Sequence, residues 1–314
     1  MNSNTIFIDI ETTGLSPETS ALTILGAKTL HGDVRQWFNE TGREQKEILS
    51  EFLTFISSYD EIVTFNGTTF DLPYLAHKCS DYNLSPVWKE KKHVDLYQKL
   101  KKIKHLFPWK NLKQKTLESY LNISRRDKLS NRAMIKTYQD FLDSKDDFMK
   151  EKLLLHNQED LIGLEAIYSL LSFQALLDGN FKIISSSFAD SLDIHFKLDT
   201  CIPINLSVRK DNMTLCITHE TGIFSCPVLN GQVYHYYPDT KDYYYLDNGN
   251  VLLPKAMGQT IPRSQRHHPA PDQCRTYFCP TTEFLSQTQQ LYTLCAHNIT
   301  YILRKDTTKE IEIL

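Results

Sequence analysis

Two acidic residues near the start of the chain are spaced so that their carboxylates could act on the same ligand. Asp9 and Glu11 lie two positions apart in the alternating run Phe7-Ile8-Asp9-Ile10-Glu11, so in a strand both carboxylates project from one face. Two like charges side by side on a partly apolar face are costly unless a cation lies between them. A divalent ion such as Mg²⁺, which prefers carboxylate oxygens, is one solution. A pair of acids exposed to solvent at a strand end is the structural alternative.

Further acids occur in two later segments. Residues 64–73, Thr-Phe-Asn-Gly-Thr-Thr-Phe-Asp-Leu-Pro, predict a strand that ends at an Asn-Gly turn, after which Asp71 opens a helix. In the long helix expected later, His156 and Asp160 are four positions apart and share one face, which Leu164 continues toward the core. Helix capping by Asp71 and an intrahelical His156–Asp160 pair are the structural alternatives to metal binding.

The elements that must position these residues follow a defined order. Strand patterns alternate with amphipathic helical patterns. The strands are expected at 5–11, 21–30, 34–38, 61–65 and around 93–94, and the helices at 44–58, from 71, from 95, and at 116–122, 131–143 and 147–176. The first three strands form a meander and the later ones belong to strand–helix units. This order favours an α/β fold with a mixed sheet flanked by helices.

In combination, the acidic segments resemble the DEDD superfamily of 3′–5′ exonucleases, which have an RNase H-like fold. The resemblance covers residues 5–172 and rests on three motifs in order: residues 7–15 (Phe-Ile-Asp-Ile-Glu-Thr-Thr-Gly-Leu), Asn66 with Phe70-Asp71, and His156 with Asp160. Within the superfamily the chain is most similar to the YprB-type RNase H-like nucleases, on the string at 64–73. The resemblance implies two bound divalent ions, Mg²⁺ or Mn²⁺, with four ligands: Asp9, Glu11, Asp71 and Asp160.

The resemblance also implies roles for neighbouring residues. In its best understood branches, water is activated by a Tyr four positions before the last Asp or by a His five before it. His156 stands at the Tyr spacing, and we expect it to act as the general base. Thr12, Leu15, Asn66 and Phe70 are expected to contact the nucleic acid.

Charge is unevenly distributed along the chain. The net charge is −3, yet residues 89–115 hold ten lysines and two acids. A basic strip on an otherwise acidic body suits phosphate binding, whereas a solvated lysine face on a helix is the alternative. From this strip we expect Lys101, Lys102 and Lys104 to bind single-stranded nucleic acid or its 3′ end.

After about residue 178 the pattern changes. Alternating segments such as 192–196, 213–217 and 299–303 predominate, which predicts a smaller, mainly β domain. We therefore expect a nuclease domain at 1–178 and a β-rich domain of unknown role at 179–314. A zinc site at His267-His268 with Cys274 and Cys279 is disfavoured, because the cysteine spacing exceeds the usual gap. The clustered tyrosines between 234 and 245 are interpreted as strand residues.

Seven scattered cysteines make a poor disulfide framework and indicate a reducing compartment. No secretory signal or membrane-spanning run is expected, so a cytoplasmic protein without a membrane partner is predicted. Protein partners are not indicated. Two other functions remain open: an RNase H-like endonuclease that cuts hybrid or branched nucleic acid, and a catalytically weak nucleic-acid-binding module, suggested by the unusual His156.

Overall fold

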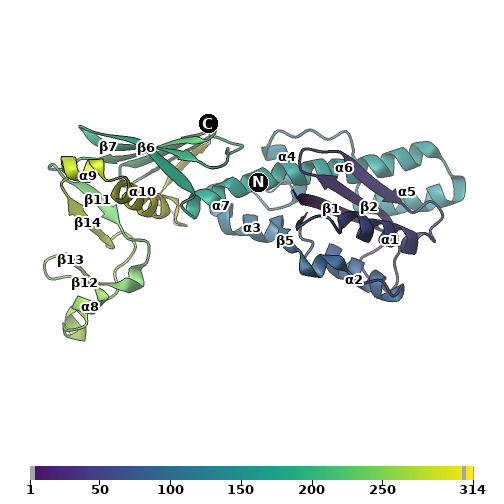
Figure 1. Cartoon of the computed structure of the whole chain (residues 1–314), viewed down its shortest axis with the longest axis horizontal. Helices are drawn as coiled ribbons and strands as arrows, with labels where there is room; N and C mark the ends of the chain where they lie inside the picture. The colour runs from purple at the N-terminus through teal and green to yellow at the C-terminus, as the bar shows by residue number, and fades with distance from the viewer. Residues whose placement is uncertain (1–3, 306–308, 314) are drawn as a thin grey trace. The chain divides into compact units, whose positions relative to one another are not determined.

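The structure is a computed structural model that describes residues 4–305 and 309–313. These residues form two compact units (Figure 1). The first comprises the chain up to Lys104 together with Pro108–Leu171, and the second comprises His105–Phe107 and the chain from Ser172 onward. Each unit has its own sheet.

The first unit is built on a five-stranded mixed sheet with the order β3-β2-β1-β4-β5. The meander pairs antiparallel, β1 with β2 and β2 with β3, whereas β4 and β5 add in parallel. The strands are β1 (Thr5–Thr12), β2 (Leu22–Thr29), β3 (Val34–Phe38), β4 (Glu61–Thr64) and β5 (Lys92–Asp95). The predicted mixed sheet of an α/β fold is confirmed.

Helices cover both faces of this sheet (Figure 1). Ile6, Ile8 and Ile10 of β1 pack with apolar residues of α1 (Gln45–Ile56) and α2 (Asp71–Asp81) in one core cluster. On the opposite face, Phe7 meets Tyr168 of the long helix α6 (Asp147–Tyr168) edge to face, with ring centroids 5.4 Å apart. Period-two alternation on β1 therefore sends its isoleucines toward α1 and α2 and its acids toward α6.

Three shorter helices complete the unit: α3 (Leu96–Ile103), α4 (Gln114–Tyr120) and α5 (Asn131–Ser144). α5 packs beside α6, and Met134, Tyr138 and Phe141 form a core with Ile24 of β2. α4 also packs against α6.

The stretch Asp147–Leu177 is long and apolar enough to cross a membrane by length and composition alone. However, 44% of its most apolar window is buried inside the protein, where Leu153, Leu161 and Leu164 of α6 belong to the core. The sequence expectation that no segment approaches this length was therefore too strict.

The second unit holds a six-stranded antiparallel sheet with the order β15-β8-β9-β10-β7-β6 and two small two-stranded sheets, β11-β14 and β12-β13. Its strands are β6 (Phe181–Phe188), β7 (Ser191–Leu198), β8 (Leu206–Lys210), β9 (Met213–Thr218), β10 (Thr221–Pro227), β11 (Val233–Tyr236), β12 (Tyr243–Leu246), β13 (Val251–Pro254), β14 (Arg275–Phe278) and β15 (Glu310–Ile313). Its helices are α7 (Ser172–Leu177), α8 (Lys255–Gly258), α9 (Thr282–Ser286) and α10 (Thr288–Leu303). This part of the chain is mainly β, as predicted.

The strand expected at 299–303 is wrong, because these residues end helix α10. The buried positions Leu291, Leu294, Cys295 and Asn298 precede Ile302 at intervals of three and four, which is the helical period. Four β-branched and aromatic residues in a row, at 299–302, resemble a strand when the preceding turns of the helix are left out.

Candidate metal centre

β1 and α6 bring three of the predicted residues to one point. Nε2 of His156 lies 3.7 Å from Oε1 of Glu11 and 3.4 Å from Oδ2 of Asp160. The ligand atoms of Glu11, His156 and Asp160 all lie within 4.8 Å of one another. Four-residue spacing on the helix thus places the histidine and the aspartate together over the acidic face of the strand.

Asp71 reaches the same group of acids from the start of α2. Its side chain is buried, and its charge acts on both Asp9 and Glu11. Helix capping, the structural alternative for Asp71, is wrong, because Phe70 occupies the N-cap position and Asp71 is the first helical residue. The Asp71 carboxylate therefore does not cap α2 and can act together with the carboxylates of Asp9 and Glu11.

The loop that carries Asp71 is held by Asp95, at the end of the neighbouring strand β5. Oδ1 of Asp95 accepts a hydrogen bond from the amide of Asn66 (3.0 Å), and Oδ2 accepts one from the amide of Thr68 (3.1 Å). The same side chain caps α3 at Gln98, as expected for Asp at this position. Asn66 adopts a left-handed φ of 63°, which suits the predicted Asn-Gly turn.

Crowding and burial raise the pKa values of these carboxyls. Desolvation, followed by the charges of Asp160, Glu11 and Asp71, holds the pKa of Asp9 well above its usual range. Desolvation and then neighbouring charges, of which Asp160 is the largest, raise the pKa of Glu11 to about 8. Desolvation raises the pKa of Asp71 to about 7. A set of converging carboxylate oxygens that resist ionising together fits a hard divalent cation.

His156 is oriented by Asp127, a residue that the sequence analysis missed. Nδ1 of His156 lies 2.6 Å from Oδ2 of Asp127, and both side chains are buried. Glu159 holds the loop in place by accepting hydrogen bonds from the amides of Arg126 (3.0 Å) and Asp127 (2.9 Å). The simple intrahelical pair of His156 with Asp160 is therefore only part of the arrangement.

Arg125 is the buried cation of the site, and it was also missed. Its Nη2 donates to Oδ1 of Asp160 over 2.7 Å, and its Nη1 donates to Oε2 of Glu118 over 3.3 Å. Nε lies 3.7 Å from Oε2 of Glu159. Glu118 of α4 reaches this point because Gly163 of α6 has no side chain. A Cβ on Gly163 would lie 1.9 Å from Oε1 of Glu118. One guanidinium thus balances part of the local negative charge.

Asn157 was the third omission. Its Nδ2 donates to Oδ2 of Asp9 over 2.8 Å, and its Oδ1 accepts from Nε2 of Gln36 over 2.8 Å. The side chain is fully buried. It fits only because β2 has Gly26 opposite Asp9, where a Cβ would lie 2.1 Å from Oδ1 of Asn157.

A cavity of about 570 Å³ adjoins the carboxylates. Asp160 and His156 form one part of its wall, and the rest comes from the loop after β4 and from the segments around α3, α4 and α5. Among the lining residues are two aromatics, two lysines and an amide: Phe65, Tyr97, Lys113, Lys115 and Asn66. The lysines come from the basic strip but are not the three that were singled out.

The other residues predicted to contact nucleic acid differ in their exposure and in the groups that they touch. Leu15 is 83% exposed, Thr12 donates a hydrogen bond to the carbonyl of Gly14, and Phe70 packs beside Tyr74. Lys101, Lys102 and Lys104 are all exposed, on or directly after α3. Their contacts with nucleic acid remain predictions.

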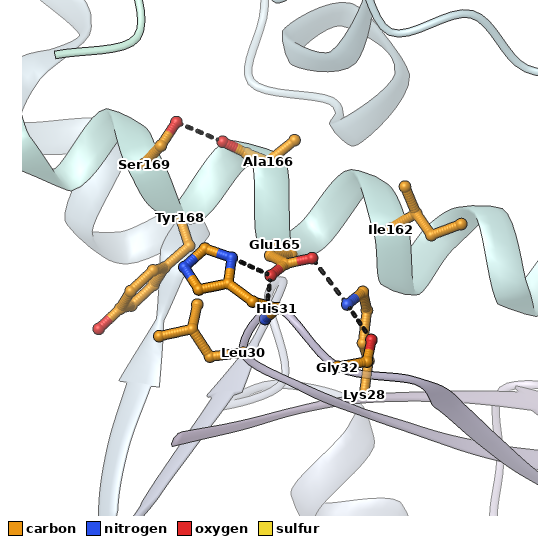
Figure 2. Close-up of a pocket in the computed structure, with 9 residues that line it drawn as sticks. All are labelled: Lys28, Leu30, His31, Gly32, Ile162, Glu165, Ala166, Tyr168 and Ser169. Atoms are coloured by element: carbon orange, nitrogen blue, oxygen red, sulfur yellow. Dashed lines mark hydrogen bonds and ion pairs between the residues drawn. The ribbon is translucent and has the colours of Figure 1, made fainter. Parts of the chain in front are cut away.

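A second cavity lies between β2 and the carboxyl-terminal part of α6 (Figure 2). Its central charges satisfy each other: Nζ of Lys28 lies 2.8 Å from Oε2 of Glu165, and the amide of His31 donates to Oε1 of the same residue. Its lining includes none of the four predicted metal ligands. We therefore assign the chemistry to the carboxylate site.

Within the described part of the chain, Glu11, His156 and Asp160 are the one group of acids, histidines or cysteines whose ligand atoms converge in this way. The disfavoured zinc site forms no such group, and Nε2 of His267 instead lies 3.1 Å from Oδ1 of Asp247. Tyr236 is buried and stacks on Tyr301, with ring centroids 3.6 Å apart, in keeping with a packing role.

Comparison with known proteins identifies the fold family of the first unit. A family model described as RNase_H superfamily matches residues 6–172, slightly more than half of the chain. A search of curated proteins finds no match.

Solved structures give more distant likenesses. The family B DNA polymerase from the hyperthermophilic archaeon Pyrobaculum calidifontis is 21% identical over 55% of this chain, with a TM-score of 0.44, and the match spans 25% of the polymerase. Brucella melitensis NrnC bound to pGG is 18% identical over 57% of this chain and 76% of that protein, with a TM-score of 0.39. A structure described as the apo form of the nuclease gives 18% identity over 56% of this chain and 75% of that one, also with a TM-score of 0.39.

Proposed function

Since this chain belongs to the RNase H superfamily, we propose that its first unit is a metal-dependent nuclease that hydrolyses phosphodiester bonds. The proposal extends to a 3′–5′ exonuclease of the DEDD type, related to the YprB group, that acts on single-stranded DNA or RNA or on 3′ ends. One observation carries it: the ligand atoms of Glu11, His156 and Asp160 converge within 4.8 Å of one another, and the charges of Asp71 and Asp160 act on both Asp9 and Glu11.

Two divalent cations, when bound, would supply an activated water and neutralise charge on the leaving oxygen. The chain's own part is to hold them and to fix the ligands. Asn157 would orient Asp9 through its 2.8 Å hydrogen bond. Gln114 would steady Asp160 by donating to its backbone carbonyl over 2.8 Å. Such partners of metal ligands set their direction.

The adjoining cavity supports a nucleotide as the ligand. Its volume of about 570 Å³ is in the range of small-molecule sites. Phe65 and Tyr97, whose ring centroids are 6.1 Å apart, offer aromatic surface on which a base stacks. Lys113 and Lys115 offer charge to a phosphate without reading sequence.

Two roles for His156 agree with this proposal. It would accept the proton of the attacking water, as the sequence predicts, or it would bind a cation itself. In both cases Asp127 fixes the ring through Nδ1 and leaves Nε2 facing the carboxylates.

The direct test is digestion of 5′-labelled single-stranded DNA and RNA with Mg²⁺ or Mn²⁺, beside circular substrates of the same sequence. We expect a ladder that shortens from the 3′ end and no cutting of circles. Cutting of circles would indicate the endonuclease instead. Binding without cleavage would indicate a nucleic-acid-binding module.

Asp9→Asn and Asp160→Asn should abolish cleavage, because each loss of a ligand removes several kcal/mol of transition-state stabilisation, on the order of 10²-fold or more in rate. Thermal melting of the same variants separates loss of chemistry from loss of fold. Near-native activity of Asp160→Asn with a native melting curve would show that Asp160 is not part of the catalytic site.

A further inference from the structure

We propose that His156 is itself a metal ligand, and that with Glu11 and Asp160 it forms a mixed nitrogen–oxygen site selective for Mn²⁺ or a similar transition-metal ion over Mg²⁺. This rests on the proposed function, because it specifies the ion that the nuclease site would take. It differs from the expected general base, which would stand beside the ion without contacting it.

The separations of the donor atoms suit a single ion. Ligands at about 2.1 Å from a cation lie roughly 3 Å apart when adjacent and roughly 4 Å apart when opposite. Nε2 of His156 is 3.4 Å from Oδ2 of Asp160 and 3.7 Å from Oε1 of Glu11, and no pair among the three ligand atoms exceeds 4.8 Å. For these three ligand atoms to contact one ion, the side chains would have to shift by roughly a few tenths of an ångström.

The other ring nitrogen has the partner that a metal-bound histidine needs. A histidine that binds a metal through one nitrogen almost always donates the other N–H to a carboxylate or carbonyl. Here Nδ1 lies 2.6 Å from Oδ2 of Asp127. Oδ1 of Asp127 accepts from the amide of Leu129 over 2.9 Å, which fixes the carboxylate plane. With Nδ1–H donating, the neutral ring presents a lone pair at Nε2.

The surroundings of Nε2 favour ligation over proton transfer to a water. The His156 side chain is 5% exposed, and its Nε2 points between the oxygens of two acids that the family motif assigns to metal binding. His156 also lines the cavity described above, but its Nε2 lies 3.4 Å from an oxygen of Asp160 and 3.7 Å from an oxygen of Glu11, within the ligand group itself. A general base would instead lie within hydrogen-bond reach of a water held by the ions.

The donor set predicts which ion is preferred. Imidazole nitrogen is a common ligand of first-row transition-metal ions, whose affinity for a nitrogen–oxygen site rises from Mn²⁺ through Co²⁺, whereas Mg²⁺ favours carboxylate oxygen and water. Asp9 and Asp71 offer oxygen alone and would suit a hard second ion. The two ion positions would therefore differ in selectivity.

Pulsed electron paramagnetic resonance of bound Mn²⁺ tests the proposal without using activity. We expect hyperfine coupling to one imidazole ¹⁴N in the native chain and in the control His31→Ala, whose side chain is largely exposed and lies at Glu165. His156→Ala should remove this coupling and weaken Mn²⁺ binding, measured by calorimetry, by more than it weakens Mg²⁺ binding. Asp127→Asn should weaken Mn²⁺ binding about 10- to 100-fold, as for other partners of metal-bound histidines.

The outcomes separate this inference from the proposed function. If Mn²⁺ binds natively without nitrogen coupling, and the Glu11→Gln variant loses that binding, His156 is not a ligand while the carboxylate centre stands. If neither ion binds to the native chain, both proposals fail. Loss of turnover in His156→Ala with unchanged coupling and Mn²⁺ affinity would return His156 to the general-base role.

Discussion

The carboxamide of Asn157 donates a 2.8 Å hydrogen bond to Oδ2 of Asp9 across the layer between α6 and β1. The amide oxygen of Asn157 accepts from Gln36 of β3 in turn. Three elements that are distant in sequence are therefore linked through one buried side chain, and the direction in which Asp9 presents its oxygens is fixed by that link.

Asn157→Ala should lower both metal affinity and stability. Removing the donor frees Asp9, which should weaken Mn²⁺ binding about 10- to 100-fold. It also removes the donor to the buried Oδ2 of Asp9, which should cost about 1–3 kcal/mol of unfolding free energy, while Gln36 keeps its hydrogen bond to the carbonyl of Leu154. Calorimetry and urea unfolding measure the two effects, with Gln158→Ala on the same helix as the control. A native affinity in Asn157→Ala would mean that Asp9 needs no orienting partner.

Without metal, the protein should be less stable at pH 8 than at pH 5. The pKa values of Asp71 and Glu11 rise from about 4 in the unfolded chain to about 7 and about 8 in the fold. The folded state therefore binds more protons across this window, and the unfolding free energy falls as pH rises through it. Urea unfolding in a chelator at pH 5, 6, 7 and 8 measures the slope.

Glu11→Gln is the control for this pH dependence, because it removes one of the carboxyls whose pKa is raised and leaves Asp9 and Asp71. Its unfolding free energy should fall less steeply between pH 5 and 8. Saturating Mn²⁺ should flatten or reverse the slope of the native chain, since the cation binds the ionised carboxylates. A native slope in Glu11→Gln would show that groups elsewhere cause the pH dependence.

Arg125→Met should strongly destabilise the protein. The guanidinium pairs with Asp160 and Glu118, whose side chains are 15% and 1% exposed, and removing it leaves buried acids uncompensated. Breaking a buried pair costs about 3–5 kcal/mol. The neighbouring Arg126 is 82% exposed, so Arg126→Met should cost less than about 1 kcal/mol. Equal unfolding free energies for the two variants would contradict the buried role of Arg125.

The two sets of lysines should differ in substrate binding. Lys113 and Lys115 line the cavity, so replacing both with Glu should weaken oligonucleotide binding and reduce the salt slope by roughly one unit per lost phosphate contact. The triple variant at Lys101, Lys102 and Lys104 tests the original prediction by the same titration. A larger effect in the triple variant would place the nucleic-acid path along α3 instead.

Local patterns were sufficient for the parts of the site that lie on regular elements. Asp9 and Glu11 follow strand alternation, and His156 and Asp160 follow the helical period, so their common faces were predictable without the fold. The Asn-Gly turn before Asp71 was predictable in the same way. Each of these signals spans only a few residues.

The residues that support these ligands gave no such signal. Arg125 and Asp127 lie in an irregular loop between α4 and α5, where no period indicates which side chains turn inward. Asn157 has the right helical position beside His156, but its partner Asp9 is 148 residues away. Which lysines of the basic strip reach the cavity likewise depends on the tertiary path of the loop before α4. Only long-range packing decides these contacts.

The least reactive residue of the sheet sets a limit on how this site could change. Gly26 has no functional group, yet any larger residue there would push Asn157 out of the layer beside Asp9. Replacing a glycine within a strand by alanine ordinarily stabilises the strand. A screen for stability alone would therefore select Gly26→Ala if α6 can shift to make room for the methyl group. The same change would separate the helix ligands from the strand ligands. The distance between the ligands on β1 and the ligands on α6 therefore depends on residue 26 having no side chain.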